Sequence, residues 1–317
     1  MGAYTVKRIL SLIPVLLIVS IVVFLITHLT PGNPAAIILG QGASADQIAA
    51  LSKKMGLDKP VMEQFFIWIS NIAHGDFGYS YFLNRSVLGA IWDNVGPTFS
   101  LALLAQVIGV TFALLFGVYA AKHKGKVRDE AIMGASLLGI SIPSFLLGSL
   151  LILLFAVQLR IFPVSGYVPL NAGLFEHLRY LILPAITLGT IQAALITRMT
   201  RSSLLDTISE NFVKTAKAKG LSERTVMLKH TLRVGFLPIL TVIGESFGGL
   251  VTGAAVTEAL FNIPGLGQLI VSSIERRDYA LIQGAVLLIT IVYVIVNLVV
   301  DLLYAVIDPR VRNSYHD

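Results

Sequence analysis

The chain has 317 residues, of which 55% are hydrophobic and 13% are charged, a composition that excludes an ordinary soluble domain and indicates a polytopic membrane protein. It has no cysteine, which excludes disulfides, thiolate metal sites and cysteine nucleophiles. The formal net charge of +6 is compatible with nucleic-acid binding, but its distribution along the chain favours a different explanation.

Six apolar segments are long enough to cross the hydrocarbon region as helices, for which about 20 residues are needed. The first follows Lys7 and Arg8, as a signal peptide would, but it runs for 21 residues and lacks a small-residue cleavage pattern. We interpret it as a retained anchor. The six predicted spans are Ile9–Leu29, Phe99–Ala121, Ala131–Leu159, Tyr180–Thr197, Phe236–Phe261 and Ala280–Ile307.

Lysine and arginine are unequally distributed between the two sides of these spans. Sixteen of the 24 lie in the N-terminal segment, residues 122–130, residues 198–235 and the C-terminal segment, and eight lie on the other side. The positive-inside rule therefore places both termini and these two loops in the cytoplasm. The asymmetry explains the basic composition by the orientation of the protein in the membrane. Membrane lipid is therefore an expected partner, and nucleic acid is not.

The segment between the first two spans, residues 31–96, is a long extracytoplasmic connection. The pattern predicts helices over Gln47–Met55 and Val61–Ala73, with turns that contain glycine and proline between them. Phe65 and Trp68 of the second helix are expected to pack on the outer ends of the spans. The segment then forms a lid or docking ledge, or else a purely structural cap.

Prolines interrupt the third and fourth predicted spans. Pro143 predicts a kink in a span that is longer than a straight crossing needs, and Pro184 predicts one near the start of the fourth. A gating role and a packing role both stay open for these prolines.

Residues 198–235 are a mostly polar stretch between two apolar spans, and they carry eight of the 24 Lys and Arg residues. A short helix with a Ser or Asn cap at its start is expected over Ser209–Lys219, and Gly220 stands where a left-handed C-cap is expected. Ser222 can cap a second helix over Glu223–Arg233. We call these two helices and the glycine between them, residues 209–233, the knuckle.

Small residues recur at four-residue spacing in the fifth predicted span. Two rows share this spacing, namely Gly244, Gly248 and Thr252, and Gly249, Gly253 and Thr257. Such rows let another helix approach closely in lipid, so we expect a core helix at a bundle or subunit interface. The sequence around Ser246 also matches the GxSxG nucleophile elbow, but it lies in a predicted membrane helix, while His230 is on the cytoplasmic loop.

Three acidic residues lie in predicted spans: Glu245 and Glu258 in the fifth and Asp301 in the sixth. An ionisable group inside a membrane is a functional hypothesis because its desolvation is costly. Glu245 lies deepest by position and is a candidate for lining a pathway or for structural pairing. Glu258 and Asp301 lie near span ends, where they are expected to reach water or a cation.

The connection between the fifth and sixth spans contains the helix-breaking sequence Pro264-Gly265-Leu266-Gly267. An amphipathic turn starts at Leu266, so a short re-entrant or surface helix is expected over the extracytoplasmic mouth. Pro264, Gly265 and Leu266 are therefore candidate gate residues, with a plain connector as the alternative.

Together these segments resemble the B-type permease subunit of dipeptide, oligopeptide and nickel ABC importers, a branch of the type I importer family, over nearly the whole chain. The most specific stretches are Arg198–Ser203, Thr215–Leu221, Pro264–Gly267, Arg276–Tyr279, Asn297–Asp301 and Asp308–Arg310. The resemblance implies an all-α fold of six transmembrane helices. It divides the chain into residues 1–96, a transmembrane domain over 97–308, and a cytoplasmic tail over 309–317.

In this family the cytoplasmic EAA motif forms a coupling helix that inserts into a groove on an ATPase subunit, and the knuckle stands in its place. The resemblance implies that the coupling residues are Lys214, Thr215, Ala216, Lys217, Lys219, Gly220 and Leu221. Ala216 and Gly220 match the motif. Lys214 stands at the position of its glutamate, so a specific ion pair from that glutamate is not expected.

The chain has no Walker A sequence, so ATP and Mg²⁺ are expected on partner subunits, and no catalytic residue, metal or cofactor is assigned to it. The resemblance implies a heterodimer with a second permease, two ATPase subunits and an extracytoplasmic substrate-binding protein, in the cytoplasmic (inner) membrane of a prokaryote. The transporter would work by alternating access, and its expected substrates are dipeptides or oligopeptides. Nickel, a metal chelate and glutathione are the alternative substrates.

Two functions of other classes predict different behaviour. An ion-coupled secondary transporter would need a coupling site near mid-membrane, commonly within related repeats, and the two halves show no convincing repeat. Its uptake would follow a proton gradient without an ATPase. A membrane hydrolase would lose its activity in Ser246→Ala.

Overall fold

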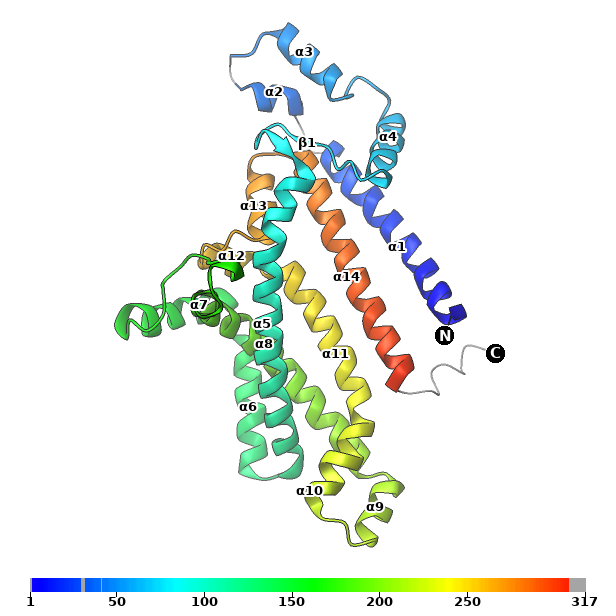
Figure 1. Ribbon diagram of the computed structural model, residues 1–317, viewed down its shortest axis with the longest axis vertical. Coiled ribbons are helices and arrows are strands. Elements are labelled where there is room, and N and C mark those ends of the chain that lie inside the picture. Colours follow the sequence, from blue (N-terminus) through cyan, green and yellow to red (C-terminus); the bar gives the residue numbers. More distant parts are fainter. Residues whose placement is uncertain (1, 30–31, 41, 308–317) are drawn as a thin grey trace.

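The computed structural model describes residues 2–29, 32–40 and 42–307, and its long helices run side by side along one axis (Figure 1). A short hairpin interrupts them, in which β1 (Tyr79–Ser80) pairs antiparallel with β2 (Arg85–Ser86). The predicted all-α fold is confirmed. The predicted tail over residues 309–317 lies outside the described residues.

The first helix, α1, leads into the predicted extracytoplasmic segment, which contains three short helices. Their bounds are α1 (Gly2–Leu29), α2 (Pro34–Leu39), α3 (Ala45–Lys54) and α4 (Val61–Ala73). Ser44 accepts a hydrogen bond from the Gln47 N–H, and the Gln47 side chain accepts one from the Ser44 N–H. This capping box starts α3 at Ala45, two residues before the predicted start at Gln47.

Aromatic side chains hold α4 against the outer end of α1. The ring centroids of Phe65 and Trp68 lie 5.2 Å and 5.7 Å from that of Phe24. His28 Nε2 lies 3.0 Å from Gln64 Oε1, which adds a polar contact between the same two helices. The predicted packing of this segment on the first span is therefore correct. A cavity of about 910 Å³ lies between α4, α1 and the start of α14 (Tyr279–Ile307).

Two long helices, α5 (Val87–Lys122) and α8 (Leu174–Ile208), form the centre of the bundle. They touch backbone to backbone, since a Cβ on Gly189 would lie 2.9 Å from the Ala105 carbonyl oxygen. A Cβ on Gly117 would lie 2.5 Å from Thr200 Cβ. These glycines let the two helices pack closer than larger side chains would allow.

The third predicted span is not one kinked helix. It is a pair of segments bent by 101°, α6 (Val127–Ser141) and then α7 (Ser144–Leu151) with the π-helical η1 (Ile152–Gln158). Pro143 stands at the break, where Ile142 takes the extended ψ of 122° that a following proline favours. Figure 1 shows α7 lying across the direction of the long helices.

The fourth predicted span extends past its expected end, because α8 continues to Ile208. After it come α9 (Asn211–Ala218), α10 (Glu223–Thr225), the π-helical η3 (Val226–Thr231) and α11 (Leu232–Gly253). The fifth predicted span, Phe236–Phe261, is also interrupted: α11 ends at Gly253, and a separate α12 (Ala255–Leu260) follows.

The last two helices are α13 (Leu266–Glu275) and α14, so the predicted short helix after Pro264 is present. Four described segments are long and apolar enough to cross a membrane, namely Val87–Lys122, Leu174–Ile208, Glu223–Val251 and Tyr279–Leu303. The bent pair is a fifth candidate, and α1 contributes a shorter apolar stretch, Leu10–Ile26. The count of six spans stays a prediction.

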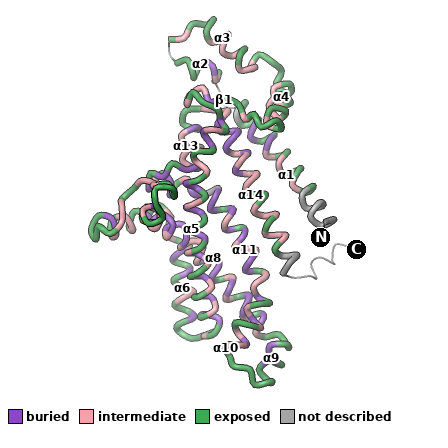
Figure 2. The backbone as a smooth tube through the Cα atoms, viewed as in Figure 1, coloured by how far each residue is buried: buried purple, intermediate pink, exposed green. Residues whose placement is uncertain are grey.

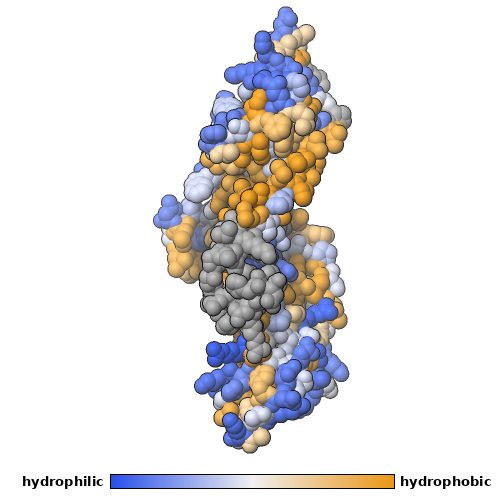
Figure 3. All heavy atoms as spheres, turned by 90° about the vertical axis from the view of Figure 1, so that its right-hand side faces the viewer, coloured by the Kyte–Doolittle hydropathy of each residue, from blue (hydrophilic) through white to orange (hydrophobic). Residues whose placement is uncertain are grey.

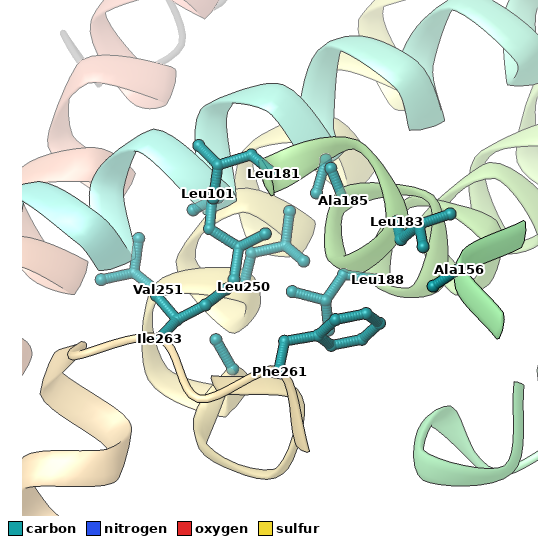
Figure 4. Close-up of a cluster of buried hydrophobic side chains, with 13 residues drawn as sticks. Leu101, Ala156, Leu181, Leu183, Ala185, Leu188, Leu250, Val251, Phe261 and Ile263 are labelled. Atoms are coloured by element: carbon teal, nitrogen blue, oxygen red, sulfur yellow. The ribbon is translucent and has the colours of Figure 1, made fainter. Parts of the chain in front are cut away.

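On the face shown in Figure 3, hydrophobic side chains gather above and beside the grey residues, and hydrophilic ones gather at the two ends. Buried residues follow the inner sides of α5, α8 and α11 (Figure 2). The largest buried cluster joins these helices to η1 and to the residues after α12 (Figure 4). Its labelled members include Leu101, Ala156, Leu183, Val251 and Phe261.

Candidate functional sites: the knuckle and the α12–α13 turn

The first half of the knuckle is a short helix that ends in a Schellman motif. Gly220 has φ +77°, and its N–H donates to the Lys217 carbonyl oxygen at 2.9 Å. The Leu221 N–H donates to the Ala216 carbonyl oxygen at 3.4 Å. These are the two hydrogen bonds of that motif, and glycine takes the left-handed position without the strain a Cβ would bring. The predicted cap at Gly220 is confirmed.

Of the two predicted N-caps in the knuckle, one is confirmed and the other is wrong. Ser222 Oγ accepts the Thr225 N–H at 3.4 Å, as a predicted N-cap should. The first helix begins at Asn211, and the N-cap residue Glu210 makes no side-chain capping bond, so the expected Ser or Asn cap is wrong. The second half is also no separate helix, because α10 runs through η3 into α11.

A small apolar core holds the knuckle together. Val213, Ala216 and Val226 are buried against one another between α9 and η3. Ala216 therefore packs inside the knuckle, although it was predicted as one of the coupling residues. The other predicted coupling residues are exposed, namely Lys214, Thr215, Lys217, Lys219, Gly220 and Leu221.

The exposed side of the knuckle combines apolar and basic groups. Phe212 and Leu221 are each 40% exposed, so two large apolar side chains reach the surface of the knuckle. Lys217 and Lys219 lie on the same short helix and its cap. This surface can bind an apolar groove with acidic residues around it.

Two helices carry the knuckle, and they are joined just above it. Ser203 Oγ of α8 donates to the Gly235 carbonyl oxygen of α11 at 2.7 Å, and both residues are buried or closely packed. A Cβ on Gly235 would lie 3.2 Å from the Ser203 Oγ and from Thr207 Oγ1. A displacement of the knuckle would therefore move α8 and α11 together.

An ion pair ties the same end of α8 to the turn between α5 and α6. The Arg201 Nε and Nη2 atoms donate to the two Asp129 carboxylate oxygens at 2.5 Å and 2.7 Å. Asp129 is 2% exposed, and the Gly125 N–H also donates to its carboxylate at 3.0 Å. Sequence reasoning missed this pair. Its one signal was the pair of acidic residues, Asp129 and Glu130, at the end of the otherwise basic segment 122–130.

On the predicted extracytoplasmic side, the predicted gate residues do not line an open mouth. Pro264 is exposed, whereas Gly265 is buried, and Leu266 is 2% exposed in a core with Ile91 and Leu281. In this conformation Leu266 is a packing residue.

The burial of the acidic residues in the predicted spans is the reverse of the predicted order. Glu245, predicted as the deepest, is exposed on α11. Glu258, predicted to reach water from the end of its span, is 0% exposed on α12. The break between α11 and α12 places Glu258 in the interior, and a straight fifth helix would not have done so.

The predicted rows of small residues have different neighbours. A Cβ on Gly244 would overlap Val300, and one on Gly248 would lie 2.5 Å from the Tyr293 ring, so these glycines face α14. A Cβ on Gly249 would meet nothing within 4 Å. The surroundings of Gly253 fall outside the described side chains.

Comparison with known families covers almost the whole chain. Residues 113–313 match the model of the binding-protein-dependent transport system inner membrane component, and residues 1–102 match the N-terminal model of such membrane components. The permease fold is also found in a solved chain of the MetNI methionine ABC transporter, with a TM-score of 0.55 and 17% identity. That match covers 70% of this chain and 97% of the other.

Curated relatives are similar along their full length. The probable peptide ABC transporter permease protein y4tP of Sinorhizobium fredii is 42% identical, over 98% of this chain and 100% of the relative. The glutathione transport system permease protein GsiC of Escherichia coli K12 is 43% identical, over 98% of both chains. The chain therefore belongs to the family of binding-protein-dependent transport system inner membrane components, the permeases of type I ABC importers.

Proposed function

We propose that this chain forms half of the translocation pathway of an ATP-driven importer for short peptides, glutathione included. The full-length similarity to relatives named as peptide and glutathione permeases supports this substrate class. The chain would pair with a second permease in the cytoplasmic membrane of a prokaryote and receive its substrate from an extracytoplasmic binding protein.

The observation that carries the mechanism is the knuckle. Its exposed Phe212 and Leu221, beside Lys217 and Lys219, offer an apolar and basic surface to a partner. We place that surface in a groove of an ATPase subunit, which holds ATP and Mg²⁺. Lys214 stands where the family motif has glutamate, so contact there relies on shape and on the surrounding positive charge.

Transport would then follow from rigid-body motion. When two ATPase subunits close on ATP, the knuckles of the two permeases approach each other, and each moves the α8 and α11 helices on which it is mounted. Binding of ATP would open the permease pair toward the binding protein, and hydrolysis would return it to the inward-facing state. No atom of this chain takes part in the hydrolysis itself.

The test is reconstitution of the complete transporter in proteoliposomes, with uptake and ATP hydrolysis measured in the same preparation. We expect Gly220→Asp to insert and assemble but to lose peptide-stimulated hydrolysis and uptake, because φ is +77° there and an acidic side chain repels an acidic groove. Gly56→Asp is the matched control, because Gly56 ends α3 with φ +72° and the same pair of cap hydrogen bonds but lies outside the knuckle.

Three results would contradict the proposal. Normal coupling in the assembled Gly220→Asp transporter would remove the knuckle from the mechanism. Uptake that follows a proton gradient without any ATPase would make the protein a secondary transporter. Uptake of nickel or a metal chelate, with neither dialanine nor glutathione competing, would reject the substrate class.

A further inference from the structure

The carboxylate of Glu258 is the most completely buried acidic group in the described part of the chain, and the proposed mechanism gives it no role. Thr98 Oγ1 of α5 donates to Glu258 Oε1 at 2.5 Å, and the Gln268 N–H donates to Oε2 at 3.0 Å. The Gly267 N–H supplies a further hydrogen bond. Since every one of these partners is a donor, the arrangement suits an acceptor-only carboxylate.

These hydrogen bonds cap the N-terminus of α13. The N-cap residue Gly265 has no side chain with which to bind the first N–H groups of that helix. The Leu266 N–H donates to Thr98 Oγ1 at 2.8 Å, and the next two N–H groups reach Glu258. The capping contacts that a helix usually obtains from its own N-cap residue come here from side chains of α5 and α12. The helix dipole favours a negative charge at this end.

Both glycines of the Pro264–Gly267 sequence are needed for this approach. A Cβ on Gly265 would overlap the Glu258 carboxylate, and a Cβ on Gly267 would lie 2.5 Å from Ala255 Cα. Leu266, between them, turns into the core beside Ile91. The motif therefore seats the first turn of α13 on the carboxylate and on the end of α5.

The far end of α13 is also fixed by a carboxylate. Ser80 of β1, which is 0% exposed, donates a short hydrogen bond to Asp278 just after the helix. The Arg276 guanidinium lies 4.2 Å from the ring centroid of Phe82 in the same hairpin. Two acidic residues thus attach the two ends of α13 to different parts of the extracytoplasmic surface.

We propose that Glu258 is a positioning residue for transport: through Thr98 and the first turn of α13, it fixes this helix against α5 in the position that coupled transport requires. Glu258 acts on the position of α13 and does not touch the substrate. The effect on transport rests on the proposed function, whereas the effect on α13 does not.

The absence of cysteine from the chain makes the position of α13 directly measurable. Ser273 on α13 is 2% exposed, so Ser273→Cys should resist a membrane-impermeant maleimide, while Val271→Cys, at 44% exposed, should react readily. Loss of the Glu258 or Thr98 contacts should speed the labelling of Ser273→Cys by about tenfold or more, as expected for lost buried hydrogen bonds. The labelling rate of Val271→Cys should not change.

Four variants in the complete transporter separate the hydroxyl and the carboxylate from simple packing. Glu258→Ala removes all the acceptors, and Glu258→Gln keeps the shape but replaces one acceptor oxygen by a donor. Thr98→Val removes the hydroxyl at constant shape, and Thr98→Ser restores it. We expect Ala, Val and Gln at these positions to expose Ser273→Cys and to lower uptake per ATP hydrolysed, and Thr98→Ser to match the parent.

The outcomes are distinct. The proposal is overturned if Ser273→Cys stays protected in Glu258→Ala and Thr98→Val, or if it becomes reactive while uptake per ATP is normal. Should Glu258→Ala fail to assemble, the Thr98→Val and Thr98→Ser pair gives the same decision. Should the parent import no peptide, the labelling still tests the attachment of α13, so the two proposals fail separately.

Discussion

The buried pair of Asp129 and Arg201 gives a sharp prediction about stability. Asp129→Asn keeps the size of the side chain but removes the charge, so one of the two contacts with Arg201, at 2.5 Å and 2.7 Å, becomes donor against donor. Removing one partner of a fully buried ion pair costs about 3–5 kcal/mol. The Arg201 side chain keeps 27% of its exposure and some of its hydration, so we expect about 2–3 kcal/mol.

The assay is thermal unfolding of the purified transporter in detergent, read by a thiol-independent signal such as intrinsic fluorescence. A loss of about 2–3 kcal/mol corresponds to a midpoint about 3–5 °C lower for a chain of 317 residues, because the entropy of unfolding scales with chain length. The additional Arg201→Gln substitution should cost much less in the Asp129→Asn background than alone, because the two side chains share one interaction.

The chain offers a matched control in the pair of Arg85 and Asp93. The distance between Arg85 Nη2 and Asp93 Oδ2 is also 2.7 Å, but the two side chains are 43% and 63% exposed. Asp93→Asn should therefore cost less than about 1 kcal/mol. If Asp129→Asn lowers the midpoint no more than Asp93→Asn does, the reasoning from burial is wrong.

Two further predictions test the packing of side chains in the helix bundle. Gly248→Ala should destabilise by about 1–3 kcal/mol because its Cβ would lie 2.5 Å from the Tyr293 ring, whereas Gly249→Ala, with nothing within 4 Å, should be neutral. Equal unfolding midpoints for the two variants would contradict this packing. Leu266→Asp should reduce the yield of assembled transporter, because a charge would enter a buried core. A well-assembled but leaky Leu266→Asp transporter would restore the gate interpretation.

The parts of the fold that the sequence predicts correctly are those decided within a few residues. Gly220 ends its helix because only a left-handed residue can complete the local hydrogen bonds, and Ser222 starts the next segment for an equally local reason. The bounds of α4 were predicted correctly too. These features depend on backbone chemistry that a short window of sequence contains.

The parts that it misses depend on residues far apart in the chain. A proline predicts a kink at Pro143, but the 101° bend also needs the packing of α7, where a Cβ on Gly148 would lie 2.6 Å from Leu260. Asp129 and Arg201 are 72 positions apart, and Thr98 and Glu258 are 160 apart. The depth of Glu258 was misjudged because distance from the end of a span measures burial only if the helix is straight.

The two candidate sites are joined by one helix pair. α5 carries Thr98 in its N-terminal third, where α13 is attached, and its C-terminal end leads to the turn that holds Asp129. Between these points α5 and α8 pack closely at Gly189, where a Cβ would lie 2.9 Å from the Ala105 carbonyl oxygen and 3.4 Å from Ile108 Cγ2. On the proposed function, a movement of the knuckle would shift α8 and α5 as one body and pull on the N-terminus of α13. This connection explains why a carboxylate remote from the ATPase surface can affect how ATP hydrolysis is coupled to uptake.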